Sequence, residues 1–218
     1  EVKPKHSVMD MCAAPGSKTS QLLEMLHAAS GEATPRGVVV ANDASLQRAN
    51  LLTHQCKRSH SPALIVTNHQ AQLWPILYDE KKGKKLRFDR ILADVPCSGD
   101  GTLRKSPDLW KKWNASSGVD LHSLQLEIAT HALRLLEVRG RLVYSTCSLN
   151  PLENESVVAA LLKRAKGSVE LVDVSKSLPE LKRRPGMKKW KVGDRVEGNY
   201  EGMGGFYLAR ISKVNKAA

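Results

Sequence analysis

The chain has 218 residues, 41% of them hydrophobic, which is enough for one well-buried α/β domain that needs no disulfide bonds. Its 34 Lys and Arg residues against 22 Asp and Glu residues give a net charge of +12, so we expect a polyanionic partner, nucleic acid before an acidic membrane surface. The four cysteines form neither a C-x-x-C pair nor a cluster with zinc-ligand spacing, which excludes a small disulfide framework and predicts no metal site.

The sequence shows no signal-peptide core and no membrane-length apolar run, so we expect no membrane partner. Free thiols indicate a reducing compartment. The chain begins at Glu1 rather than at a methionine, from which we expect residues 1–218 to be a single domain of a longer protein, with flanking modules missing. We expect this domain to be a monomer.

The first half of the chain predicts strands at residues 7–11, 37–43 and 63–67, and helices at residues 19–26 and 46–56. Small residues connect the first strand to the first helix: Cys12, Ala13, Ala14, Pro15, Gly16, Ser17 and Lys18. Small side chains let a ligand approach the backbone, and the free amides of a helix start suit a carboxylate or another polar group. An ordinary tight turn would have the same composition, so this segment alone does not decide the function.

The second predicted strand ends at Asp43, just before the second helix. In a doubly wound sheet, an acidic residue at this point can accept both hydroxyls of a ribose. Asp next to Ser45 is also common at helix starts, where it caps the first free amides. The small-residue turn and the acidic strand end together favour the ribose clamp.

The second half predicts strands at residues 88–95, 141–146 and 169–174, and helices at residues 121–138, stopped by Gly140, and 153–166. A last strand at residues 205–211 is expected to be antiparallel at the sheet edge, within a hairpin of residues 190–218. The start of this hairpin also resembles a Tudor-like barrel, but too little chain follows Ile211 to close one. Strands and helices that alternate at this spacing predict a doubly wound α/β sheet with ligands at its carboxyl edge.

Basic and aromatic residues interleave in the long connection of residues 96–120. They are Arg104, Lys105, Trp110, Lys111, Lys112 and Trp113. Such residues could hold phosphates and stack a base. A lid that packs its indole rings inward is the alternative, which we favour for at least one of the two tryptophans.

Two cysteines follow predicted strands in similar surroundings. Cys97 stands in D-V-P-C-S-G, residues 94–99, and Cys147 stands in Y-S-T-C-S-L-N-P, residues 144–151. A thiol at a strand end, between small hydroxyl residues, can act as a nucleophile. Two thiols in such a setting are a stronger indication of chemistry than one.

The segments DMCAAPGSK, AND, DRILADVPCSGDGTLRK and GRLVYSTCSLNPLENE together resemble the Sun-domain (NSUN) RNA cytosine-5 methyltransferases, in particular those that act on transfer RNA. The likeness runs from about Ser7 to Trp190, and the paired P-C-S-G and S-T-C-S cysteines make it highly specific. It implies a Rossmann-like class I S-adenosyl-L-methionine-dependent methyltransferase fold, with RNA, and tRNA in particular, as the partner. It also implies an intracellular location, in the nucleus of a eukaryotic cell and otherwise in the cytoplasm.

By this resemblance the cofactor is S-adenosyl-L-methionine. Residues 12–18 would wrap its methionine end, Asp43 would hold its ribose, and Asp94 would lie near the reacting methyl and the base. Gln70 departs from the family, which usually has Asp at the point that meets the adenine. The amide oxygen of Gln70 could still accept a hydrogen bond from the exocyclic amine.

Carbon 5 of cytosine is too weak a nucleophile to take a methyl group from a sulfonium, so a thiolate must first add to carbon 6. We expect Cys147 to be that nucleophile. Asp94 would act as an acid at the ring nitrogen, with Lys18 holding neighbouring charge in place. The resemblance assigns the later release of the carbon 5 proton to Cys97, directly or through a water. The target base must be unpaired, looped or flipped.

Three alternative functions stay open. DNA cytosine-5 methyltransferases use similar chemistry but take their nucleophile from a Pro-Cys pair, which here would be Cys97. A binding-only RNA protein with a degenerate domain would keep the sheet and the basic face, and Gln70 is its one hint. A different nucleotide-dependent transferase could use the same small-residue turn, but it gives no reason for the second thiol.

Overall fold

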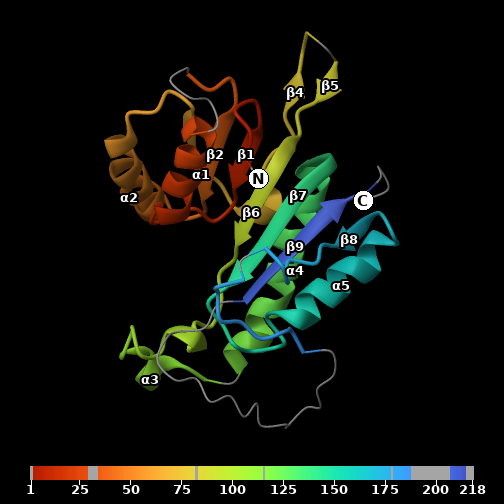
Figure 1. Cartoon of the computed structure of the whole chain (residues 1–218). Helices are drawn as coiled ribbons and strands as arrows, with labels where there is room; N and C mark the ends of the chain where they lie inside the picture. The colour runs from red at the N-terminus through yellow and green to blue at the C-terminus, as the bar shows by residue number, and fades with distance from the viewer. Residues whose placement is uncertain are drawn as a thin grey trace.

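The computed structural model describes residues 2–28, 34–81, 83–114, 116–177, 179–187 and 207–214. Within them, seven strands form the main sheet (Figure 1). These strands are β1 (Ser7–Asp10), β2 (Val38–Asp43), β3 (Leu64–Asn68), β6 (Phe88–Asp94), β7 (Leu136–Thr146), β8 (Val169–Leu171) and β9 (Tyr207–Lys213). The helices are α1 (Ser17–Ala28), α2 (Leu46–Cys56), α3 (Leu109–Lys112), α4 (Ser116–Leu135) and α5 (Glu155–Ala165).

The strand order is β3-β2-β1-β6-β7-β9-β8. Strands β3, β2, β1, β6 and β7 are parallel to their neighbours, whereas β9 pairs antiparallel with both β7 and β8. The chain moves outward from β1 to β3 and then returns to place β6 on the other side of β1, so the strand order reverses between β1 and β6. Ligands of such sheets bind in the crevice at this reversal. The predicted doubly wound α/β fold, with an antiparallel strand at this end of the sheet, is confirmed.

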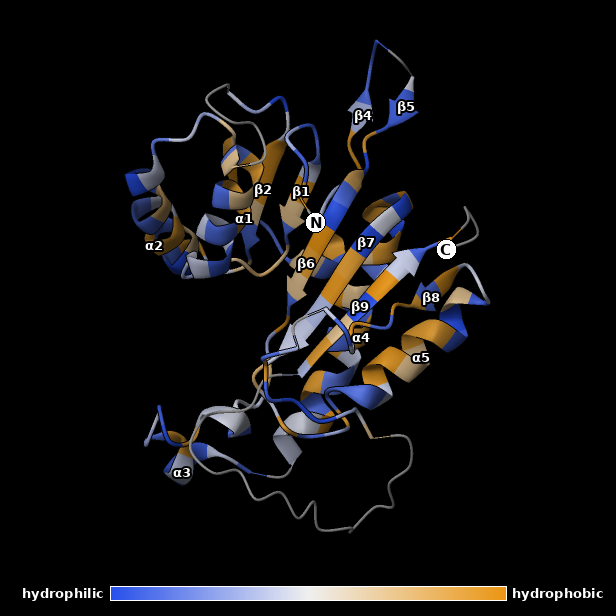
Figure 2. Ribbon diagram, viewed as in Figure 1, coloured by the Kyte–Doolittle hydropathy of each residue, from blue (hydrophilic) through white to orange (hydrophobic). Residues whose placement is uncertain are grey.

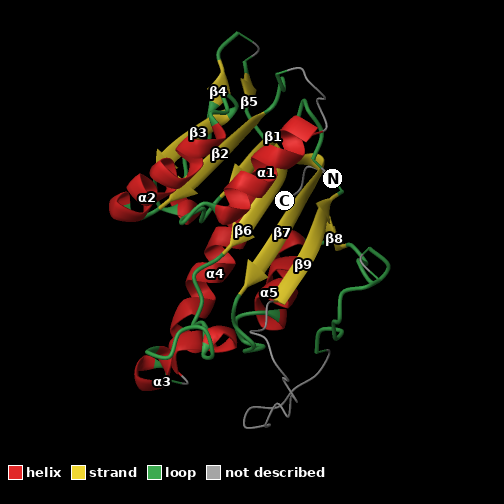
Figure 3. Cartoon of the chain, turned by 60° about the vertical axis from the view of Figure 1, so that its left-hand side comes forward, coloured by secondary structure: helices red, strands yellow, loops and turns green. Residues whose placement is uncertain are grey.

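Successive residues of the central strands face opposite layers of the molecule. Met9 and Val40 belong to the core under α4 and α5, whereas their neighbours Val8 and Val39 pack with residues of α1. Figure 3 shows α1 and α2 in front of the sheet and α4 and α5 behind it. Because both faces of the central parallel strands are covered, these strands carry apolar runs such as residues 38–41 of β2 and residues 91–93 of β6, and the latter run is orange in Figure 2.

The prediction that a helix runs to Val138 and stops at Gly140 is wrong. α4 ends at Leu135, and β7 begins at the next residue, so Gly140 lies inside the strand. Arg139 has a positive φ of 66°, and a Cβ on Gly140 would lie only 2.7 Å from the carbonyl oxygen of Glu137. The glycine therefore accommodates a tight local bend of the strand rather than a helix end.

The remaining differences are small. β8 ends at Leu171, three residues before the predicted end at residue 174, and a short hairpin of β4 (Tyr78–Asp79) and β5 (Lys84–Lys85) flanks the polar turn. β9 supplies the predicted last strand. Residues 188–206, which include the first part of the predicted hairpin, lie outside the described residues. Among the helices that the structure describes, none is both long and apolar enough to cross a bilayer.

Candidate active site

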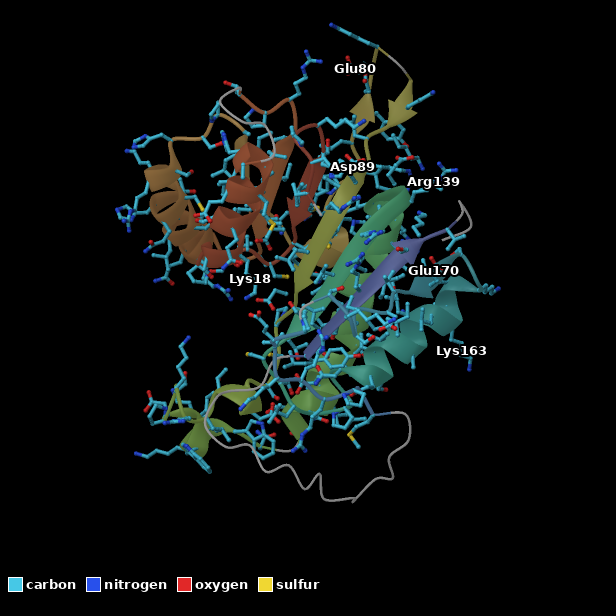
Figure 4. The ribbon with its side chains drawn as sticks, viewed as in Figure 1. Lys18, Glu80, Asp89, Arg139, Lys163 and Glu170 are labelled. Carbon is cyan, nitrogen blue, oxygen red and sulfur yellow. The ribbon has the colours of Figure 1, made fainter. Side chains whose placement is uncertain are left out.

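The predicted site residues lie together at the carboxyl ends of the parallel strands. Strands β2, β1, β6 and β7 are adjacent and parallel, so the loops that follow them converge. Asp43 ends β2, Asp94 ends β6, and Cys147 follows β7 directly. Residues 12–18 follow β1, and Figure 4 shows their last member, Lys18, at this edge.

The loop after β1 is shaped by close contact with α2. Gly16 has a φ of 113°, and a Cβ there would lie 3.0 Å from Cδ1 of Leu52 and 3.1 Å from Sγ of Cys56. Only glycine fits both this backbone conformation and this contact. Burial raises the pKa of Cys12 to about 12, so this cysteine stays a neutral thiol at neutral pH.

Asp43 ties the loop after β1 to the end of β2. Its Oδ2 accepts a hydrogen bond from the backbone N–H of Ala14 at 3.2 Å, and its Oδ1 accepts from that of Ser45 at 3.0 Å. The helix cap is Ser45, whose hydroxyl accepts from the N–H of Arg48 at 3.4 Å. The Arg48 guanidinium lies 3.4 Å from Oδ2 of Asp43 and donates to the carbonyl of Ala14 at 2.7 Å. The cap role considered for Asp43 therefore belongs to Ser45.

The Asp94 side chain accepts hydrogen bonds from two side chains, Lys18 of α1 and Ser145 of β7. Lys18 Nζ lies 2.7 Å from Oδ2 of Asp94, and the hydroxyl of Ser145 donates to Oδ1 at 2.6 Å. The Lys18 and Asp94 side chains are 39% and 27% exposed, so both remain accessible to a ligand. The structure thus brings together Lys18 and Asp94, as predicted, and adds Ser145, which the sequence reasoning missed although it lies in the Y-S-T-C motif.

The two predicted thiols are in contact. Sγ of Cys97 lies 3.2 Å from Sγ of Cys147. The hydrogen bond between the two thiols lowers the pKa of Cys147 to about 7, and the same contact raises the pKa of Cys97. Because the thiolate is the reactive form of cysteine, the lowered pKa makes Cys147 the more readily ionised thiol of the pair.

Asp10 is a further acidic residue at a strand end that the sequence reasoning missed. It is only 1% exposed, and its Oδ2 accepts from the hydroxyl of Thr19 at 2.8 Å, while its buried Oδ1 has no hydrogen-bond partner among the described residues. Burial raises the pKa of Asp10 to about 7. The DMCAAPGSK segment could have identified Asp10, because this residue ends the first strand just as Asp43 ends the second.

Gln70, the departure from the family pattern, lies exposed just beyond the end of β3. Its side-chain oxygen accepts a hydrogen bond from Nε2 of Gln72 at 3.1 Å. Within the described part of the chain, no three His, Cys, Asp or Glu side chains gather as ligands for a metal ion.

The connection after β6 forms a small lobe around α3, which hangs beyond the carboxyl ends of the strands in Figure 1. Trp110 is 71% exposed and Trp113 is 40% exposed, so the prediction that at least one indole packs inward is wrong. Leu109 instead lies against Gly99, where an added Cβ would be 3.4 Å from Cδ1 of the leucine. The lobe's lysines, Lys105, Lys111 and Lys112, are exposed as well.

Comparisons with known proteins agree with this geometry. The tRNA (cytosine(34)-C(5))-methyltransferase of Drosophila melanogaster is 53% identical over 199 residues, covering 89% of this chain and 27% of that protein. The multisite-specific tRNA:(cytosine-C(5))-methyltransferase of Saccharomyces cerevisiae is 53% identical over 199 residues, covering 89% of this chain and 29% of that protein. The chain therefore spans less than a third of the length of these two relatives.

A solved structure and a family model extend the likeness to nearly all of the chain. The crystal structure of a methyltransferase homolog protein from Pyrococcus horikoshii superposes with a TM-score of 0.70 at 27% identity, covering 97% of this chain and 63% of that one. The model of the family described as 16S rRNA methyltransferase RsmB/F matches residues 1–212. Since the match takes in every strand of the sheet and both thiols, the chain belongs to the RsmB/F methyltransferase family.

Proposed function

We propose that this domain methylates carbon 5 of cytosine in RNA, tRNA in particular, through a covalent bond between Cys147 and the base. The observation that carries the proposal is the thiol pair, 3.2 Å apart, in which the pKa of Cys147 is lowered to about 7. The two relatives are named as tRNA cytosine methyltransferases, which supports cytosine in RNA as the target.

The residues at the carboxyl edge fit S-adenosyl-L-methionine, which supplies an electrophilic methyl group when bound. The unpartnered, buried Oδ1 of Asp10 is an acceptor suited to an ammonium group at the start of the loop after β1. Residues 12–18 would hold the methionine end, Asp43 the ribose, and Asp94 would face the reacting centre. Arg48 bonds both Asp43 and Ala14, so a ribose at Asp43 would compete with this exposed guanidinium.

Cys147 begins the reaction when its thiolate adds to carbon 6 of the ring. The developing negative charge is met at the ring nitrogen by a proton that Asp94 shares with the Lys18 ammonium group, whose Nζ lies 2.7 Å from Oδ2. Ser145 fixes the other oxygen of Asp94, so the carboxyl group keeps one orientation. The target base must leave any duplex to reach these groups.

Cys97 completes the reaction, and its readiness depends on Cys147. The hydrogen bond to Cys147 is the largest cause that raises the pKa of Cys97. Once the sulfur of Cys147 is bonded to carbon, that cause is removed and Cys97 loses its proton more readily. Its thiolate can then take the proton from carbon 5, and the electron pair restores the ring double bond and expels the Cys147 thiolate. Cys97 therefore becomes a base only after Cys147 has bonded to the cytosine ring.

The test is bisulfite sequencing of unmodified tRNA and ribosomal RNA after incubation with the chain and S-adenosyl-L-methionine. We expect retained cytosines that are absent with the Cys147→Ser variant. Calorimetry with S-adenosyl-L-methionine alone is the companion measurement. Cofactor binding without any methylated cytosine in either RNA would contradict the proposal and favour a binding-only protein.

A further inference from the structure

Each cysteine of the pair is followed by a serine, and both serines bond the same carboxylate. Oε1 of Glu153 accepts a hydrogen bond from the backbone N–H of Ser98 at 2.8 Å. Oε2 of Glu153 accepts from the hydroxyls of Ser98 at 2.5 Å and Ser148 at 2.7 Å. Thus one side chain connects the loop after β6, which carries Cys97, to the loop after β7, which carries Cys147.

This carboxylate is fully enclosed. Glu153, Ser148 and Gln125 are all 0% exposed. Nε2 of Gln125, on α4, is the fourth donor to Glu153 at 3.0 Å, and it also donates to the carbonyl of Pro96 at 2.9 Å. A Cβ on Gly118, at the start of α4, would lie 3.2 Å from Oε2 of Glu153. The start of α4 therefore lies close against the carboxylate.

A buried carboxylate is costly unless its lone pairs are filled, and four donors fill them here. One of these donors, the backbone N–H of Ser98, cannot turn into an acceptor, and the Gln125 amide could present its oxygen only by giving up its bond to the Pro96 carbonyl. A glutamine at this position would keep the shape but replace one acceptor oxygen with a donating NH₂ group. A carboxylate satisfies all four donors as they stand, whereas a glutamine would require both serine hydroxyls to turn from donors into acceptors.

We propose that Glu153 is a positioning residue that sets the spacing of the two thiols by anchoring the serine after each cysteine. Its effect on turnover rests on the proposed function, whereas its effect on thiol spacing does not. The anchor is divided between the loops: Ser148 fixes the position of Cys147, and Ser98 fixes that of Cys97. The repeated Cys-Ser pair in the sequence follows from this division, since each loop needs its own donor.

The closing experiment measures thiol spacing without any substrate. Diamide takes up the two thiol hydrogens and leaves a disulfide between Cys97 and Cys147, and mass spectrometry of the digested chain follows its formation. We expect Glu153→Gln to slow this bond by about 100-fold, the scale set by a displacement of about 1 Å between reacting groups. Glu155→Gln, on the neighbouring glutamate, is the matched control and should keep the wild-type rate.

Two milder variants keep the proposal testable if Glu153→Gln does not fold. Ser98→Ala and Ser148→Ala each remove one donor, and circular dichroism checks that each variant is folded. Both should slow disulfide formation, whereas Ser168→Ala, which removes a buried hydroxyl far from the thiols, should not. Wild-type rates in both folded serine variants would overturn the proposal.

Turnover then separates this proposal from the proposed function. With RNA and S-adenosyl-L-methionine, Ser98→Ala should accumulate the covalent RNA adduct, because only the release step is displaced, whereas Ser148→Ala should form the adduct slowly. If the variants slow disulfide formation but the wild-type chain never methylates cytosine, the positioning role stands and the proposed function fails. If the wild type methylates and Ser98→Ala and Ser148→Ala behave alike in every step, the division of the anchor is wrong.

Discussion

The loop after β6 and the loop after β7 each carry a Cys-Ser pair, but the two cysteines differ in pKa. Each follows a parallel strand with a Cys-Ser pair, and each serine bonds Glu153. Yet the hydrogen bond between the two cysteines lowers the pKa of Cys147 to about 7 and raises the pKa of Cys97. The same residue type therefore ionises differently in the two loops, and this difference underlies the two roles that we propose.

We expect removal of the Cys147 thiol to have the largest effect on methyl transfer. We expect Cys147→Ser to lower the rate of methyl transfer on the order of 10,000-fold or more, because a serine hydroxyl is not ionised at neutral pH. Incorporation of a labelled methyl group into RNA measures the rate, and Ser168→Ala, which removes a buried hydroxyl outside the site, is the control. Full turnover in Cys147→Ser with none in Cys97→Ser would reverse the roles, as in DNA cytosine-5 methyltransferases.

Removing the other thiol should stop the reaction at a later point. We expect Cys97→Ala to accumulate a covalent complex between RNA and protein, because Cys147 still adds to the base but nothing takes up the proton from carbon 5. A denaturing gel shows this complex as a slowly migrating band that the double variant Cys97→Ala/Cys147→Ala lacks. The absence of any band in Cys97→Ala would remove the release role of Cys97.

Asp94 acts between the two loops, since it ends β6 and bonds Ser145 of β7. We expect Asp94→Asn to slow methyl transfer by about 100-fold to about 10,000-fold, the range for a positioned acid, because an amide cannot supply the ring proton. Ser145→Ala should cost only about tenfold, the scale of one neutral hydrogen bond. Equal losses in the two variants would show that Asp94 only orders the site.

The pH dependence of alkylation reports the thiol contact directly. The pKa of Cys147 is lowered, so its thiolate fraction grows as pH rises, and alkylation by iodoacetamide should be half-maximal near pH 7. In Cys97→Ala the donor is lost and the pKa should return toward 9.0, which slows alkylation at pH 7 by at least about tenfold. Cys97→Ser, which keeps an O–H donor, should lie between the two.

The smallest expected effect concerns the lobe that only the loop after β6 carries. We expect Lys111→Ala/Lys112→Ala to weaken RNA binding severalfold and to reduce the slope of log affinity against log salt by about 2, because each exposed lysine neutralises one phosphate. Filter binding over a salt series measures the slope. Lys163→Ala/Lys166→Ala, at the end of α5, is the matched control and should leave the slope unchanged.

The sequence predicts those parts of the molecule that depend on local patterns. Apolar runs that end in polar residues located the strands, and the strand ends brought Lys18 near Asp94 and Cys97 near Cys147 as expected. Gly140 misled the prediction because a glycine that bends a strand has the same local sequence as one that ends a helix.

The anchor of the thiols could not be predicted in this way. Glu153 and Glu155 stand two residues apart, and nothing local shows which of them turns inward. The donors that decide the question, Ser98, Gln125 and Ser148, come from three separate segments. The contact between the two thiols is likewise made by tertiary packing, since Cys97 and Cys147 are fifty residues apart in the chain.

The insertion of β9 between β7 and β8 has a consequence for synthesis on the ribosome. β7 leads directly to Cys147, and its antiparallel neighbour comes from residues 207–213, which are translated long after it. In a nascent chain, the edge of β7 that later pairs with β9 is therefore exposed beside the Cys147 thiol. It stays unpaired until residues 207–213 have been synthesised and form β9.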